Sequence, residues 1–69
     1  MIRPWTERRA EAARHVVAGR RIIERQHRLI ARQRDLGHDT VASVSLLHRF
    51  QRTQAIFESD LAAINAEAI

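Results

Sequence analysis

The chain has 69 residues, which allows one small domain, residues 1–69, and no second one. Its 45% apolar residues include only three aromatic ones, so the core is thin, and the absence of cysteine excludes disulfides and thiolate metal sites. Twelve arginines, no lysine and eight acidic residues give a net charge of +4, with +6 on residues 1–36 and −2 on residues 37–69.

The start of the chain carries no targeting or membrane signal. No run approaches the roughly 20 apolar residues that a membrane span needs, and Met1 to Trp5 lead into charged sequence rather than into an apolar signal core. We therefore expect a cytoplasmic protein without a membrane partner. Residues 1–4, which end on Pro4, are expected to be a frayed N-terminus.

The first predicted element is a helix over about residues 6–36. Its larger apolar residues, such as Val16 and Ile23, lie on one face of a helix with 3.6 residues per turn, and strand alternation does not fit. Just before it, Trp5 has two open interpretations. It is a hydrophobic staple that packs near Ala10, or part of an exposed patch that docks another protein.

Residues 37–40, Gly-His-Asp-Thr, are expected to reverse the chain. Gly37 can adopt the left-handed conformation that ends the first helix. Asp39 or Thr40 can accept hydrogen bonds from the free amides that open the next helix. A tight turn between two helices follows.

The second predicted helix covers about residues 41–66. Its core positions recur at alternating steps of three and four residues, the spacing of a coiled-coil seam, and they are Leu47, Phe50, Gln54, Phe57, Leu61 and Ile64. Only Gln54 breaks the apolar pattern. Two helices of matched length with a short turn predict an all-α fold, a two-helix antiparallel hairpin.

The hairpin also predicts a register. A reversal centred near residue 38 makes residue i face roughly residue 76 − i. Gly19 then lies opposite Phe57. We expect the missing side chain of Gly19 to leave room for that ring, because a helix-interior glycine otherwise costs about 1 kcal/mol relative to alanine.

Two helices side by side cover only part of each apolar face, so the hairpin is expected to bury the remainder against another chain. A second copy gives the simplest closed solution, a dimeric four-helix bundle, and a different helical protein is the other candidate partner. The predicted self-association seam consists of Val16, Gly19, Ile22, Ile23, Gln26, Leu29, Ile30, Gln33, Leu36, Leu47, Phe50, Gln54, Phe57, Leu61 and Ile64. The expected function is that of a small interaction or regulatory module.

Three members of the predicted seam are polar: Gln26, Gln33 and Gln54. A buried amide without partners costs about 1–3 kcal/mol. One interpretation is that these side chains bond across the bundle and fix register and partner choice. The other is that they lie at the wet edge of the apolar stripe.

An arginine stripe follows the outward face of the first helix over about 27 Å. Its members are Arg14, Arg21, Arg25, Arg28 and Arg32. Such a stripe can contact phosphates, so an RNA- or DNA-binding hairpin dimer is the alternative function. The competing interpretation is a solvated helix face, and no aromatic residue interleaves with the stripe to stack on bases.

The sequence shows no pattern for catalysis, for a cofactor or for a metal. The histidines at 15, 27, 38 and 48 include no i, i+4 pair, and two glycines cannot build a phosphate-binding loop. Glu7 and Glu11 share a helix face, but they lie in an arginine-rich first turn. We expect a protein that is not an enzyme and that uses no cofactor and no metal.

Four segments of the chain form a recognisable pattern: Arg21-Ile22-Ile23-Glu24-Arg25-Gln26, Leu29-Ile30-Ala31-Arg32, Gly37-His38-Asp39-Thr40 and Leu46-Leu47 with Phe50. Over about residues 15–61 this pattern resembles a set of small bacterial hypothetical proteins built as a charged helix, a Gly-His-Asp-Thr turn and a second helix. The turn is its most distinctive piece. The resemblance implies a helical hairpin, and because that group has no assigned activity, it transfers no site.

Overall fold

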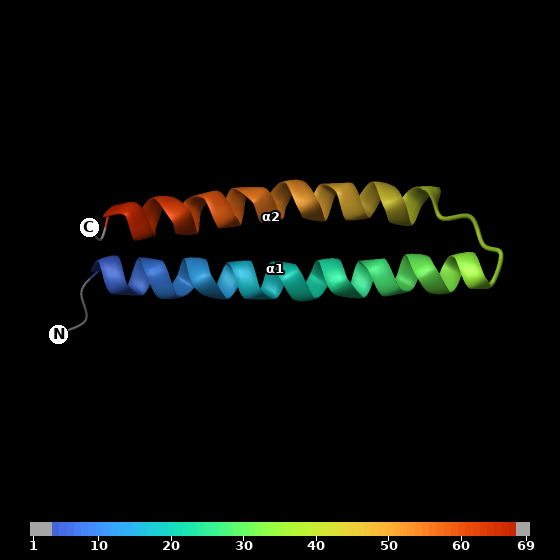
Figure 1. Ribbon diagram of the computed structural model, residues 1–69, viewed down its shortest axis with the longest axis horizontal. Helices are drawn as coiled ribbons and strands as arrows, with labels where there is room; N and C mark the ends of the chain where they lie inside the picture. The colour runs from blue at the N-terminus through green and yellow to red at the C-terminus, as the bar shows by residue number, and fades with distance from the viewer. Residues whose placement is uncertain (1–3, 68–69) are drawn as a thin grey trace.

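The computed structural model describes residues 4–67 and shows two long antiparallel helices, α1 (Pro4–Asp35) and α2 (Val41–Glu67) (Figure 1). The predicted two-helix hairpin is confirmed. Of the N-terminus that we expected to fray, residues 1–3 lie outside the described residues, and Pro4 begins α1. A proline is tolerated there because the first turn of a helix needs no intrahelical amide bond.

A glycine closes α1 in the predicted turn. Gly37 has a φ of 72°, and its amide donates to the carbonyl of Arg34 at 3.0 Å, while the amide of His38 donates to that of Gln33 at 2.8 Å. These two bonds form a Schellman motif. Asp39 lies just before α2, and its Oδ1 accepts a hydrogen bond from the amide of Val41, the first residue of that helix, at 2.9 Å.

The register differs from the predicted one by about one helical turn. His15 packs against Phe57, Gln26 bonds to Ser43, and Gly19 faces Gln54 rather than Phe57. The residue numbers of these contacting pairs add up to 69–73, not to 76. The prediction of a symmetric reversal was wrong because the connecting segment runs back beside the last turn of α1, which extends beyond the start of α2 (Figure 1).

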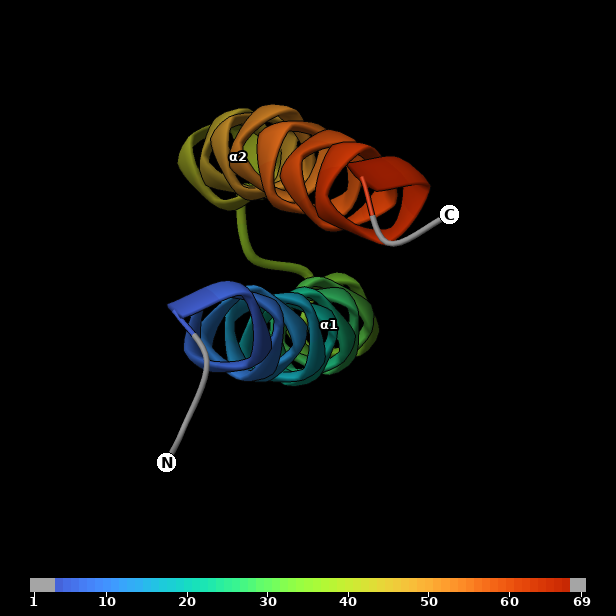
Figure 2. The same cartoon turned by 90° about the vertical axis from the view of Figure 1, so that its left-hand side faces the viewer.

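The core of the hairpin is a single seam between the helices, which cross at a shallow angle (Figure 2). Its buried apolar residues are Val16, Ile30, Leu47 and Ile64. Among residues 4–67, no side chain is less than 2% exposed. Each helix therefore contributes one narrow stripe to the core.

The hairpin is long and exposes much of its surface. It measures 54 × 18 × 14 Å, and its solvent-accessible surface is 5560 Å². A compact monomer of 8.0 kDa is expected to expose only about 4,450 Å². Within residues 4–67, neither helix has the length and apolarity needed to cross a membrane.

Candidate interaction surface

Three residues of the predicted seam do not reach the interior of the hairpin. Ile22, Leu29 and Leu36 are 37%, 44% and 60% exposed, whereas the other twelve seam residues are buried or half-buried between the helices. On α2, Leu46 is 39% exposed. We call Ile22, Leu29, Leu36 and Leu46 the apolar strip.

The apolar strip lies on one long side of the hairpin. Its α1 members belong to a series that recurs every seven residues, 8, 15, 22, 29 and 36, and such a series keeps one face of a helix. Arg8 and His15 of this series reach α2: Arg8 Nη1 donates to Glu67 Oε2 at 3.3 Å, and the His15 and Phe57 ring centroids are 5.0 Å apart. Because Leu46 belongs to the α2 series that ends at Glu67, it lies on the same side, the apolar flank.

The opposite long side, the polar flank, carries a different set of side chains. There Arg20 Nη2 donates to Glu58 Oε1 at 2.9 Å. Val17 and Val41, which are 46% and 74% exposed, border this flank, while the larger Ile56, 60% exposed, borders the apolar flank. Most of the large apolar side chains that the seam leaves exposed in residues 4–67 thus lie on or beside the apolar flank.

A shallow groove of about 330 Å³ lies on the apolar flank at the open end of the hairpin, away from the turn. Apolar side chains and charged side chains share its lining, which consists of Arg8, Glu11, Ala12, His15, Phe57, Asp60, Ala63, Ile64 and Glu67. Its three carboxylates outnumber its single arginine. We call it the terminal groove.

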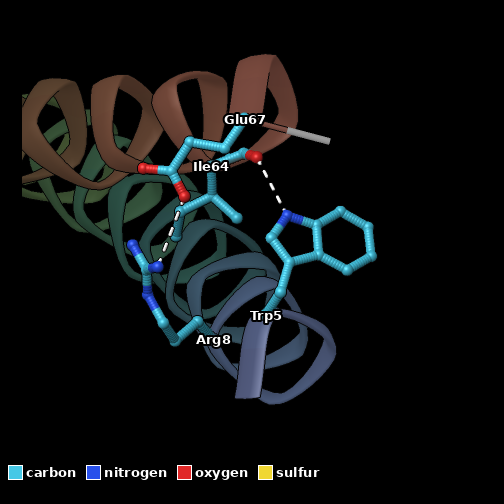
Figure 3. A network of polar contacts seen from close by, with 4 residues as sticks. All are labelled: Trp5, Arg8, Ile64 and Glu67. Carbon is cyan, nitrogen blue, oxygen red and sulfur yellow. Dashed lines mark hydrogen bonds and ion pairs between the residues drawn. The ribbon is translucent and has the colours of Figure 1, made fainter. Parts of the chain in front are cut away.

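Side-chain bonds join the helix ends beside this groove (Figure 3). Trp5 Nε1 donates to the carbonyl of Ile64 at 3.2 Å, and the pair of Arg8 and Glu67 bridges the same ends. Helices leave the carbonyls of their last turn short of amide partners, which makes Ile64 a ready acceptor. Trp5 is therefore half-buried against α2, a contact that neither sequence interpretation contained.

Two of the three seam glutamines are buried. Gln26 and Gln54 are 7% and 6% exposed, and each bonds to the backbone of the other helix: Gln26 Nε2 donates to the Ser43 carbonyl at 2.8 Å and Gln54 Nε2 to the Val16 carbonyl at 2.9 Å. Gln33 is half-buried. The partners of Gln26 and Gln54 are carbonyls within the hairpin, so these bonds hold α1 and α2 in register.

Gly19 makes room for one of these amides. A Cβ atom at residue 19 would overlap Oε1 of Gln54 and lie 2.8 Å from its Cδ. Gln54 Oε1 is buried and, within residues 4–67, has no hydrogen-bond donor. The glycine therefore accommodates a glutamine amide, and the expected ring of Phe57 packs elsewhere.

The arginine stripe lies on the exposed outer surface of α1. All five residues, Arg14, Arg21, Arg25, Arg28 and Arg32, are exposed, and none forms an ion pair with another residue of the range 4–67. The α1 arginines that do bond to α2 are Arg8, Arg9 and Arg20. The stripe thus keeps its charges available to solvent or to a partner.

Comparisons with known protein families, with curated proteins and with solved structures find no match to this chain. The resemblance to small bacterial hairpin proteins therefore stays a prediction. In the part of the chain that the structure describes, no three His, Asp or Glu side chains gather as metal ligands would. The apolar flank and the arginine stripe are the two candidate surfaces.

Sequence reasoning missed the division of the seam into an inner set and an exposed strip. The available signal was the seven-residue series that begins at Arg8 and continues through His15 to Ile22 and Leu29. Its first members are polar, and a series that is polar at one end is typical of a position beside a core rather than within it.

Proposed function

We propose that this protein is a non-enzymatic, cytoplasmic helical hairpin that self-associates into a four-helix bundle and acts as a small interaction or regulatory module. The apolar flank is its contact surface. The observation that carries the proposal is the apolar strip, in which four large side chains are between 37% and 60% exposed on one side of the hairpin. Large exposed apolar side chains that gather on one side of a protein mark a candidate interaction site.

The total surface supports the same proposal. The chain exposes roughly 1,100 Å² more than a compact monomer of its mass. Stable interfaces bury about 800 Å² on each partner. The excess is therefore large enough to supply one side of a stable interface, and a second copy brings an identical apolar flank to cover it.

The test is the molar mass in solution, measured by light scattering across a dilution series with circular dichroism on the same samples. We expect a helical species of about twice 8.0 kDa. Leu29→Gln and Leu46→Gln each place a polar amide on the strip in both copies, so each is expected to raise the dissociation constant at least tenfold.

Val17→Gln is the matched control, because Val17 is exposed to a similar degree, 46%, on the side away from the strip. It is expected to leave the dissociation constant within about twofold of the parent value. A helical monomer of 8.0 kDa at all concentrations would contradict self-association and would favour a different helical protein as the partner. Equal effects of Val17→Gln and Leu29→Gln would contradict the assignment of the flank.

A second candidate function is RNA or DNA binding through the arginine stripe. The specific observation in its favour is that all five arginines are exposed and unpaired within residues 4–67. Their guanidinium groups follow one helix over about 27 Å, a length suited to a row of phosphates.

Salt dependence separates this candidate from protein docking. Nucleic-acid binding through three phosphate contacts is expected to weaken roughly tenfold or more between 50 and 200 mM salt, and replacing Arg14, Arg21 and Arg28 by Gln removes most of that dependence. These three residues face away from the apolar flank, so the triple variant keeps the self-association surface intact. Binding to a random-sequence duplex that ignores both salt and the triple variant would exclude the arginine stripe as a phosphate site.

A further inference from the structure

The two ends of the apolar flank carry opposite charges. Towards the turn, the flanking residues are Arg25 on α1 and Arg49 on α2, both exposed. Towards the open end, the terminal groove is lined by Glu11 on α1 and by Asp60 on α2. The flank is thus basic at one end and acidic at the other.

Only two face-to-face arrangements of two identical flanks keep the helices aligned. With both turns at the same end, α1 of one copy lies over α2 of the other, and residues at the same distance from the turns face each other. With the turns at opposite ends, α1 lies over α1 of the other copy and α2 over α2, each pair antiparallel. The charges at the two ends distinguish these arrangements.

The arrangement with turns at the same end brings like charges together. The level of the hairpin's middle is marked by Gly19 and Gln54, which face each other. Arg25 and Arg49 lie on the turn side of this level, and Glu11 and Asp60 lie on the open side. Stacking α1 on α2 then sets arginine against arginine and carboxylate against carboxylate.

The arrangement with turns at opposite ends brings opposite charges together. Glu11 and Arg25 lie at similar distances on either side of Gly19 along α1, so a two-fold axis at the middle level sets each against the other in the partner copy. Arg49 and Asp60 are related in the same way about Gln54 along α2. The opposite charges therefore favour the arrangement with turns at opposite ends over the arrangement with turns at the same end.

The apolar surfaces match in the same arrangement. Leu46 lies on the turn side of Gln54 by nearly the number of residues that separate Ala63 from Gln54 on the open side. The two-fold axis therefore places Leu46 of one copy over the terminal groove of the other, at Ala63. Ile22 comes to lie over the groove residue His15.

We infer that two copies pack with their turns at opposite ends, so that Ile22 and Leu46 of each apolar strip fill the terminal groove of the other copy. This inference rests on the proposed self-association. The partner is a second copy of the chain, and each groove is completed only by the strip that the other copy contributes.

The first test is a distance between labels in the dimer. The chain has no cysteine, so Ala42→Cys carries a single nitroxide on each copy. With the turns at opposite ends, the two labels lie 24 helix residues apart in level, and pulsed electron spin resonance should give about 36 Å. With the turns together, they are separated only by the width of the bundle, about 10–20 Å.

Ala66→Cys is the matched label at the open end, in case Ala42→Cys disturbs the start of α2, and Ala66 is exposed and does not line the terminal groove. Its two labels lie 24 residues apart in level, which predicts about 36 Å. A distance of 20 Å or less at both positions in a species of twice the monomer mass would overturn the arrangement while leaving self-association intact. A monomer at all concentrations would overturn both.

The second test is a charge reversal. Arg25→Glu sets carboxylates against Glu11 in both halves of the symmetric dimer and is expected to raise the dissociation constant roughly tenfold. The double variant Arg25→Glu with Glu11→Arg should return to within about threefold of the parent. With the turns together, Arg25→Glu would instead face Arg49 and tighten the dimer, which would overturn the inference.

Discussion

The half of the hairpin next to the turn and the half at its open end hold the same two helices together by different means. In the turn half, the covalent connection with its Schellman motif fixes α1 beside α2, and Gln26 supplies the one side-chain bond between the helices within residues 4–67. In the open half, Trp5, Arg8 and Arg9 bond across, and Arg20 and Gln54 add two more bonds at the middle level.

The two halves therefore differ in the kind of side chain that occupies their flanks. Away from the turn, the chain itself no longer holds the helices, and bonding side chains occupy the flanks. Beside the turn, connectivity holds the helices already, and the flank carries Ile22, Leu29 and Leu46 instead. The half that needs the fewest bonds to keep its own fold is the half with apolar surface to offer to a partner.

The largest effect should come from Gly19→Ala, at the middle level where the open half begins. Alanine improves helix propensity by about 1 kcal/mol, yet its Cβ collides with the amide of Gln54, which can move aside only by giving up its bond to the Val16 carbonyl. We expect a net loss of about 1–3 kcal/mol in the free energy of unfolding. Urea denaturation at fixed protein concentration measures it.

The control for Gly19→Ala is the same change beside Gln54→Ala. Without the amide there is nothing to collide with, so in that background Gly19→Ala should stabilise by up to about 1 kcal/mol. A stabilising Gly19→Ala in the parent chain would show that the close contact with Gln54 does not hold the open half.

An intermediate effect is expected from Gly37→Ala in the turn half. A Cβ at this position meets no atom within 4 Å, so the whole cost comes from the φ of 72°. We expect a loss of about 1 kcal/mol in thermal unfolding, and a smaller one for Gly37→Asn, because asparagine tolerates the left-handed region. Equal stability of the alanine and glycine chains would mean that the turn does not anchor its half.

The smallest effect should come from the exposed ion pairs of the open half. Glu67→Gln removes the partner of Arg8, and Glu58→Gln removes that of Arg20; these side chains are between 46% and 64% exposed. Each change should cost about 0.2–1 kcal/mol at low salt and almost nothing in 1 M salt. A loss that persists in 1 M salt would mean that these residues act through packing instead of charge.

Periodicity was enough to predict the two helices, the turn and the spacing of the seam, because each depends on local sequence. The register was not predictable, since it depends on how far residues 38–40 run back along α1. The acceptors of Gln26 and Gln54 are backbone carbonyls that the register brings into reach, so they could not be named either. The same holds for Trp5, whose acceptor lies 59 residues away.

Because of that separation, the contact of Trp5 with α2 should form last during folding. Closing a chain segment costs more entropy as the segment lengthens, so a hairpin forms from its turn outward. The bond from Gln26 to Ser43 closes 17 residues, and the bond from Trp5 to Ile64 closes 59. Because Trp5 is the single tryptophan of the chain, its fluorescence in a rapid-mixing experiment reports when the ends of α1 and α2 come together.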